Sequence, residues 1–133
     1  MGERTALILI DTDVFVIDEI FTSDPRHSAA STFLESLPAE SRTTTIYNVL
    51  EFCGIVATAT KRDPKKTFLE FHELKGTRIL YPRLQGEFLP FANYLDKVLE
   101  RIGRGMRFGD ANILFIAEDY EADFIVTWNK RHY

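Results

Sequence analysis

The chain has 133 residues, of which 45% are hydrophobic and 27% are charged, a balance that fits one packed domain and excludes a disordered or fibrous protein. Sixteen Lys and Arg against twenty Asp and Glu give a net charge of -4, so there is no global positive field, and any contact with nucleic acid must be local. The one cysteine, Cys53, cannot form an internal disulfide, and no apolar run is long enough for a leader or a membrane span, so we expect a cytoplasmic protein without membrane contact.

A buried strand is expected near the start of the chain. Ala6 to Ile10 is an unbroken aliphatic run that ends at Asp11. This pattern is typical of a strand buried on both faces, as in the centre of a parallel sheet. Apolar residues then recur at helical spacing between residues 29 and 37, before Pro38, which predicts a helix after the first strand.

A second strand and two helices are expected in the middle of the chain. Thr43 to Ile46 is a short β-branched run, and Asn48 follows it as the expected cap of an apolar helix from Val49 to Thr60. The next helix is predicted to begin near Pro64 and to end at Gly76, because proline favours the first turn of a helix and glycine its end.

The last third of the chain repeats the alternation of strands and helices. Thr77 to Tyr81 is expected to be a strand, Glu87 to Ile102 an amphipathic helix, and Phe124 to Thr127 the last strand, with Asp110 opening a further helix between them. This alternation predicts an α/β fold, a three-layer α/β/α sandwich with a mostly parallel central sheet. The sequence has no repeat or linker, so residues 1–133 are expected to form a single domain.

Acidic residues in apolar surroundings are the candidate functional residues. Asp11 and Asp13 interrupt an aliphatic run, Glu51 is the only charged residue of an apolar helix, and Asp110 begins another apolar run. A carboxylate taken from water needs a compensating cation or hydrogen bonds, and converging carboxylates are suitable ligands for magnesium or manganese. Other interpretations stay open, since Asp110 fits a helix cap and Glu51 fits a solvated position.

Basic residues gather in a glycine-bearing loop immediately before Asp110. Arg104 and Arg107 lie in this loop and are candidates for contacts with a substrate phosphate. Favourable charges at the end of a helix are the alternative interpretation. The three histidines show no spacing typical of metal ligands.

Four segments together resemble the PIN domain: DTDVF after a strand, then NVLEFCG, FGDANIL and ADFIVTWNKRHY. The resemblance covers nearly the whole chain and is greatest to the VapC-like ribonuclease toxins. It implies that Asp11, Glu51 and Asp110 are catalytic residues that bind Mg²⁺ or Mn²⁺. It also implies that Asn129 completes the catalytic set and that Thr127 helps to position water or substrate.

The chain departs from the family pattern at two positions. Asn129 stands where the family often has aspartate, which removes one negative charge, and Asp13 stands where the family often has asparagine or serine. We interpret Asp13 as a secondary site residue that restores part of the missing charge. The sequence also stops at Tyr133, where many family members continue into one more strand, so the presence of that strand at the edge of the sheet stays open.

The resemblance implies a metal-dependent endoribonuclease that hydrolyses phosphodiester bonds of RNA. It further implies the toxin component of a toxin-antitoxin pair, a homodimer, and a small antitoxin protein as partner. Two alternatives stay open. One is a non-catalytic PIN-like interaction module, and the other is a phosphatase of the haloacid-dehalogenase type, because DTDVF after a strand also resembles the opening motif of that family.

Overall fold

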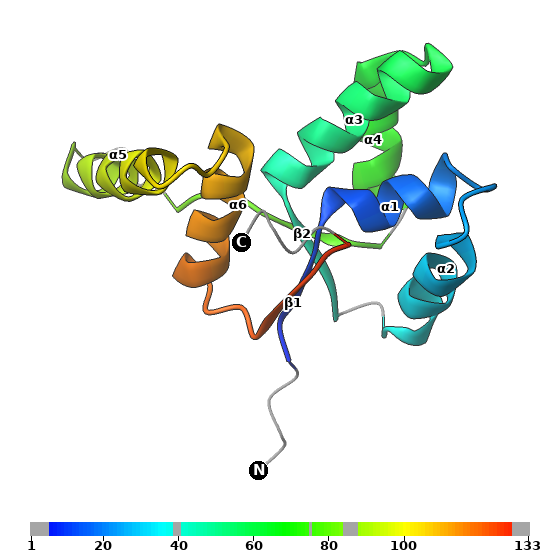
Figure 1. Cartoon of the computed structure of the whole chain (residues 1–133), viewed down its shortest axis with the longest axis horizontal. Coiled ribbons are helices and arrows are strands. Elements are labelled where there is room, and N and C mark those ends of the chain that lie inside the picture. The colour runs from blue at the N-terminus through cyan, green and yellow to red at the C-terminus, as the bar shows by residue number, and fades with distance from the viewer. Residues whose placement is uncertain (1–5, 39–40, 75, 84–87, 129–133) are drawn as a thin grey trace.

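The computed structural model describes residues 6–38, 41–74, 76–83 and 88–128, which contain a four-stranded sheet (Figure 1). The strands are β1 (Ile8–Ile10), β2 (Arg42–Thr45), β3 (Arg78–Leu80) and β4 (Phe124–Val126). Their order is β3-β2-β1-β4, and every neighbouring pair is parallel. The predicted parallel sheet is therefore confirmed, with its first predicted strand at the second position from one edge.

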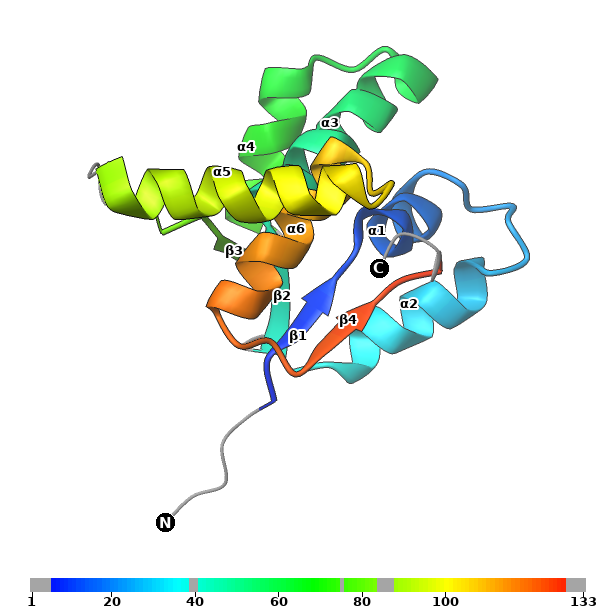
Figure 2. The same ribbon diagram turned by 60° about the vertical axis from the view of Figure 1, so that its left-hand side comes forward.

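Six helices within the described residues cover the sheet in two layers (Figure 2). The helices are α1 (Thr12–Glu19), α2 (His27–Ser36), α3 (Ile46–Thr60), α4 (Pro64–Leu74), α5 (Phe88–Gly103) and α6 (Phe108–Asp119). Side chains of α1 to α4 form one core cluster, and side chains of α5 and α6 form the other. The three-layer α/β/α sandwich is confirmed. None of the helices, within the part of the chain that is described, has the length and apolar character needed to span a membrane.

The central strand β1 contributes to both cores. Ile10 packs in the cluster of α1 to α4, and Leu9 packs in the cluster of α5 and α6. Successive side chains of a strand point to opposite faces, so an aliphatic run without polar positions suits a strand that is covered on both sides. In the larger core, Phe71 contacts Phe15 and Phe52 with ring centroids 5.2 and 5.3 Å apart. The burial of each such side chain contributes about 2 kcal/mol to stability.

Helix α1 was not predicted from the sequence. It starts directly after β1, with Asp11 as its N-cap, and its four residues from Val14 to Ile17 are all buried. Because this central turn of α1 is apolar on every side, the sequence lacks the alternation between a polar and an apolar face that reveals a surface helix.

Two helix starts differ from the predictions. The N-cap of α3 is Thr45, and Asn48 is the third helical residue, whose side chain completes a capping box with Thr45. The prediction of Asn48 as the cap was therefore wrong by one turn, because the β-branched run up to Ile46 hid the cap within the strand. Helix α6 begins at Phe108, so Asp110 lies in its first turn and does not open it.

The connections place three chain segments at the carboxyl edge of the sheet. Strand β1 runs into α1 at Asp11, β2 runs into α3 at Thr45, and β4 ends immediately before Thr127. In parallel α/β sheets this edge is where ligands bind. Asp11, Asp13, Glu51 and Thr127, which were predicted to be functional, belong to these segments.

Candidate active site

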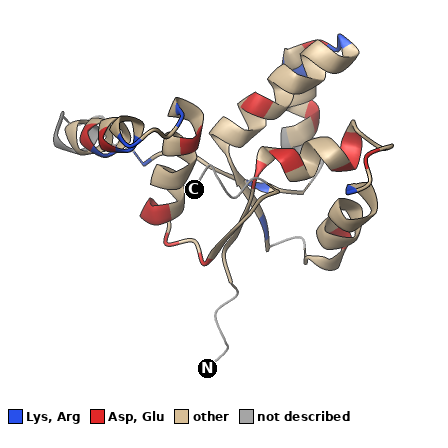
Figure 3. Ribbon diagram, viewed as in Figure 1, with Lys and Arg blue, Asp and Glu red and all other residues tan. Residues whose placement is uncertain are grey.

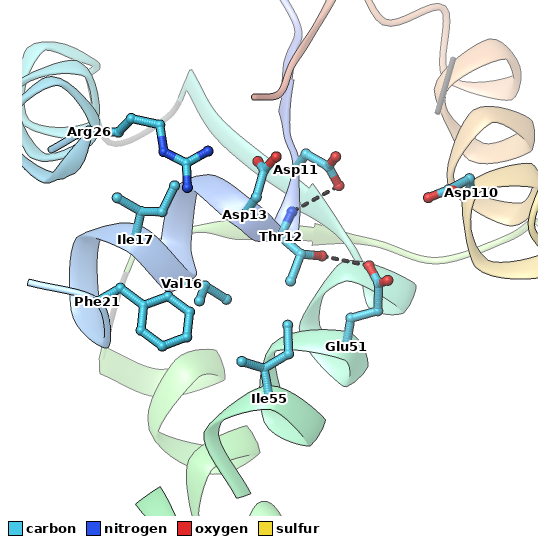
Figure 4. Close-up of a pocket in the computed structure, with 10 residues that line it drawn as sticks. All are labelled: Asp11, Thr12, Asp13, Val16, Ile17, Phe21, Arg26, Glu51, Ile55 and Asp110. Atoms are coloured by element: carbon cyan, nitrogen blue, oxygen red, sulfur yellow. Dashed lines mark hydrogen bonds between the residues drawn. The ribbon is translucent and has the colours of Figure 1, made fainter. Parts of the chain in front are cut away.

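A pocket of about 290 Å³ opens at the carboxyl end of β1 (Figure 4). Ten residues line it: Asp11, Thr12, Asp13, Val16, Ile17, Phe21, Arg26, Glu51, Ile55 and Asp110. The four acidic residues predicted from the sequence, which come from the N-cap and first turn of α1, from α3 and from α6, all line this one pocket. The carboxylates therefore come together from segments that lie far apart in the sequence.

Asp11 is held in place by three donors. It is 6% exposed, and its Oδ1 accepts hydrogen bonds from the Thr12 backbone N–H at 2.9 Å and from Nδ2 of Asn48 at 2.8 Å. Its Oδ2 accepts a hydrogen bond from the Thr127 hydroxyl at 2.8 Å. Hydrogen bonds from neutral groups stabilise the ionised carboxylate without neutralising its charge. Asp11 is thus a fixed, buried oxygen donor at the base of the pocket.

Asp13 follows Thr12 in α1, and its two carboxylate oxygens differ in their hydrogen bonds. Oδ2 accepts from the Trp128 backbone N–H at 3.0 Å and from the Thr127 hydroxyl at 3.2 Å. Oδ1 is buried and has no hydrogen-bond partner among the described residues. Burial, and then the neighbouring charge of Asp11, raise the pKa of Asp13. A buried carboxylate oxygen without a donor is a position where a bound cation would be favourable.

Glu51 lies on α3, with its side chain directed into the pocket (Figure 4). Its Oε1 accepts a hydrogen bond from the Thr12 hydroxyl at 2.7 Å. The residue is exposed, as one alternative interpretation of the sequence expected. Exposure here is exposure to the pocket, so Glu51 is accessible to a ligand and is oriented by Thr12.

Asp110 is 5% exposed and lies in the first turn of α6, across the pocket from Asp13 (Figure 4). An acidic side chain in the first turn of a helix interacts favourably with the helix dipole, so α6 itself stabilises the negative charge at this position. The preceding Gly109 borders Glu51: a Cβ built on this glycine would lie 3.9 Å from Oε2 of Glu51. Helices α3 and α6 therefore meet at the pocket.

The charge around the pocket is strongly negative. Figure 3 shows acidic residues on each of α1, α3 and α6 near the carboxyl end of β1. Carboxylate oxygens without sulfur or imidazole ligands fit a hard divalent cation, magnesium or manganese, and the uncompensated oxygen of Asp13 supports this fit. In the described ranges, however, no three His, Cys, Asp or Glu side chains are close enough to share one metal ion. Coordination by three of the acids therefore requires a side-chain rearrangement.

Thr127 is the one predicted substrate-binding residue that reaches the acids. Its hydroxyl lies within hydrogen-bond distance of both Asp11 and Asp13. Arg104 instead forms an exposed ion pair with Glu100 on α5, and Arg107 is the exposed N-cap of α6, so neither of the two arginine side chains lines the pocket. The predicted Asn129 and the question of a strand after β4 lie outside the described residues.

Sequence reasoning missed Arg26, which lines the pocket between the acids and α2. Its Nε donates to Oδ1 of Asp24 at 3.0 Å, its Nη2 donates to Oδ2 at 2.9 Å, and its guanidinium carbon lies 5.7 Å from the centre of the Trp128 ring. This pairing lowers the pKa of Asp24 to about 2. The turn-forming sequence around Arg26 gave no signal of a functional residue.

Two polar residues that orient the acids were also missed. Thr12 donates to Glu51, and Nδ2 of Asn48 donates to both Asp11 and the Thr12 hydroxyl. Asn48 was predicted only as the cap of its helix, whereas its Oδ1 accepts hydrogen bonds from the backbone N–H and the hydroxyl of Thr45, the residue that is the N-cap. The separation of 37 residues between Asn48 and Asp11 left no periodic pattern that would have revealed the contact.

Comparison with known proteins gives a match among solved structures. No protein-family model matches the sequence, and no curated protein does so. Among solved structures, the chain matches VapC20 of Mycobacterium tuberculosis, a Sarcin-Ricin loop cleaving toxin, with a TM-score of 0.72 over 94% of this chain and 92% of that one. The two sequences are 14% identical. The match confirms the resemblance to VapC-like PIN domains at the level of the fold.

Proposed function

We propose that this chain is a metal-dependent endoribonuclease that hydrolyses phosphodiester bonds of RNA. The observation that carries the proposal is the gathering of Asp11, Asp13, Glu51 and Asp110 around one pocket at the carboxyl edge of a parallel sheet. The fold shared with a toxin that cleaves the Sarcin-Ricin loop supports the choice of RNA as substrate.

Mg²⁺ or Mn²⁺ is the cofactor that we propose, with Asp11, Glu51 and Asp110 as its ligands and Asp13 as a further source of negative charge. A divalent ion bound here would lower the pKa of a water molecule and stabilise charge on the phosphate. The fixed position of Asp11, with three donors on its two oxygens, suits the ligand that anchors the ion.

The remaining polar residues of the site orient the acids. Thr12 holds Glu51 toward the pocket, and Asn48 holds both Asp11 and Thr12. Thr127 connects Asp11 to Asp13, although its hydroxyl has one proton and can donate to only one of them at a time. These contacts fix the direction of the carboxylates before a substrate arrives, which is the general requirement of an efficient site.

A biological role as a toxin is part of the same proposal. The chain would act as the toxin component of a toxin-antitoxin pair in the cytoplasm, as a homodimer, with a small antitoxin protein that blocks the pocket. Support comes from the toxin whose fold it shares. Expression of the chain should stop cell growth, Asp11→Asn should abolish this effect, and unimpaired growth with the active enzyme would contradict the role.

The direct test of the enzyme uses purified protein, labelled single-stranded RNA, and Mn²⁺, Mg²⁺ or chelator. We expect cleavage with metal only, with its loss in Asp11→Asn and Asp110→Asn. Glu118→Gln is the matched control, because Glu118 is an exposed acid that pairs with Arg101 away from the pocket. The absence of cleavage by a folded protein with either metal would overturn the proposal in favour of a non-catalytic interaction module, a function that the spacing of the acids also fits.

A further inference from the structure

The pocket has two unlike sides. The acids line one side, while Val16, Ile17, Phe21 and Ile55 line the other. Phe21 is 46% exposed and follows the end of α1, so its ring forms part of an accessible apolar wall. A hydrated metal ion gains no stabilising interaction from apolar side chains. An exposed aromatic ring beside a phosphate-cleaving centre is instead suited to stack against a nucleobase, because every base has an apolar face.

Arg26 is the one basic residue that lines the pocket within the described ranges. Asp24 occupies its Nε and one N–H of Nη2. The guanidinium group carries five N–H donors in one plane. The edge formed by Nη1 and the second N–H of Nη2 therefore points away from Asp24 and can donate hydrogen bonds to a phosphate. The Arg26 side chain is 49% exposed, which leaves this edge accessible.

The position of Arg26 is fixed before any substrate binds. Oδ1 of Asp24 also accepts a hydrogen bond from the Arg26 backbone N–H at 2.8 Å, so the side chain and the turn are held by the same carboxylate. Trp128 lies against the guanidinium group at a distance that permits a cation-π interaction. A preorganised arginine loses little side-chain entropy on binding, whereas a flexible one loses more.

We infer, on the basis of the proposed nuclease function, that Arg26 and Phe21 form the RNA-binding side of the pocket. Arg26 binds a phosphate next to the one that is cut, and Phe21 stacks on the base between them. The surrounding acids repel a polyanion, so a fixed cation at the mouth of the pocket favours the approach of the RNA backbone. Because a paired and stacked base cannot reach Phe21, the substrate has an unpaired nucleotide beside the cleaved bond.

Binding without turnover tests this inference separately from cleavage. We would measure the affinity of a fluorescent single-stranded RNA by anisotropy in the presence of chelator, for the wild type, Arg26→Gln and Phe21→Ala. Arg83→Gln is the matched control for Arg26, because Arg83 also pairs with an aspartate, Asp119, and also lies over an aromatic ring, but away from the pocket. Phe124→Ala is the control for Phe21. Phe124 is also an exposed phenylalanine, but it lies at the start of β4, at the end of the strand opposite to the pocket.

Arg26→Gln should weaken binding about tenfold and reduce the slope of log affinity against log salt by about 0.7, the value for one lost phosphate contact on a single strand. Phe21→Ala should weaken binding about fivefold or more, with an unchanged salt slope. Arg83→Gln and Phe124→Ala should bind as the wild type does. Equal affinities of Arg26→Gln and Arg83→Gln, with intact cleavage by the wild type, would overturn this inference and leave the nuclease function standing.

If Asp24 positions Arg26, then Asp24→Asn should change the affinity for RNA in the direction opposite to that expected from net charge alone. Asp24→Asn removes a negative charge, so an effect of net charge alone predicts tighter binding of RNA. Loss of the paired hydrogen bonds between Arg26 and Asp24 predicts weaker binding of RNA, and therefore a raised KM with little change in kcat. Tighter binding in Asp24→Asn would overturn the positioning role. If the wild type neither bound nor cut RNA, the nuclease function would fail, and this inference with it.

Discussion

Nδ2 of Asn48 donates a hydrogen bond of 2.8 Å to Oδ1 of Asp11, and this bond joins the first turn of α3 to the end of β1. Asn48 is 2% exposed. We predict that Asn48→Ala lowers the free energy of unfolding by about 1 to 3 kcal/mol, because it leaves a buried carboxylate oxygen with one donor fewer and breaks the capping box. Urea denaturation measures this change.

Thr58→Ala is a suitable comparison for that variant. The Thr58 hydroxyl donates to the backbone oxygen of Gly54 on the exposed face of the same helix. Its loss should change the free energy of unfolding by less than about 0.5 kcal/mol. If Asn48→Ala and Thr58→Ala unfolded at the same urea concentration, the bond between Asn48 and Asp11 would not have the stabilising role given to it here.

Thr127 offers a test of how the two aspartates are held. Thr127→Val retains the shape of the side chain but removes the hydroxyl donor that Asp11 and Asp13 share. We expect the rate of RNA cleavage to fall about tenfold or more, because hydrogen bonds to the carboxylates that bind a metal ion orient them toward it. Thr127→Ser retains the donor and should restore most of the rate. Equal rates for the valine and serine variants would show that the hydroxyl is not needed.

Metal binding should be visible as a gain in thermal stability. An ion that binds only the folded protein adds about 2.7 kcal/mol at one hundred times its dissociation constant, so Mn²⁺ should raise the Tm of the wild type measurably. Glu51→Gln should lose most of this rise, since one charged ligand becomes neutral, while Glu118→Gln should retain it. A rise in Tm of the same size in the Glu51 variant would exclude Glu51 as a metal ligand.

The pairing of Asp24 with Arg26 can be measured without RNA or metal. Hydrogen bonds from the guanidinium side chain, and then from the Arg26 backbone, lower the pKa of Asp24 to about 2. In a carboxylate-detected NMR titration, Asp24 should therefore remain ionised to a lower pH than an ordinary aspartate. Arg26→Gln should raise this pKa toward the ordinary range, and Arg83→Gln should leave it unchanged. An ordinary pKa in the wild type would contradict the fixed position of Arg26.

The layers of the fold could be predicted because their signals are local. The aliphatic run before Asp11 and the amphipathic face of α5 each depend on neighbouring residues alone, and both predictions are confirmed. Helix α1 gave no such signal, because its four central residues from Val14 to Ile17 are all apolar and buried, so no polar face marks its period. The start of α3 was misplaced for a related reason, since Thr45 ends a strand and caps a helix at once.

Some residues of the candidate site could likewise be predicted from the sequence, and others could not. Acids in apolar surroundings are conspicuous in a sequence, and the four that were singled out do line one pocket. Arg26 was not conspicuous, because its function depends on a turn that brings it back over the start of α1. Arg104 and Arg107 were predicted from their closeness in sequence to Asp110. The structure places Arg104 in the turn after α5, where it pairs with Glu100, and Arg107 at the N-cap of α6, and neither side chain lines the pocket.

The arrangement of the strands has a consequence for the timing of activity in a growing cell. Strand β4 pairs with β1, and Thr127 meets Asp11 across 116 residues of chain. A chain still emerging from the ribosome has made Asp11, Glu51 and even Asp110 before β4 is free to dock. The hydroxyl that steadies both aspartates is thus absent until translation has passed it. The hydrogen bonds that Thr127 offers to Asp11 and Asp13 therefore form only after nearly all of the described chain has been translated.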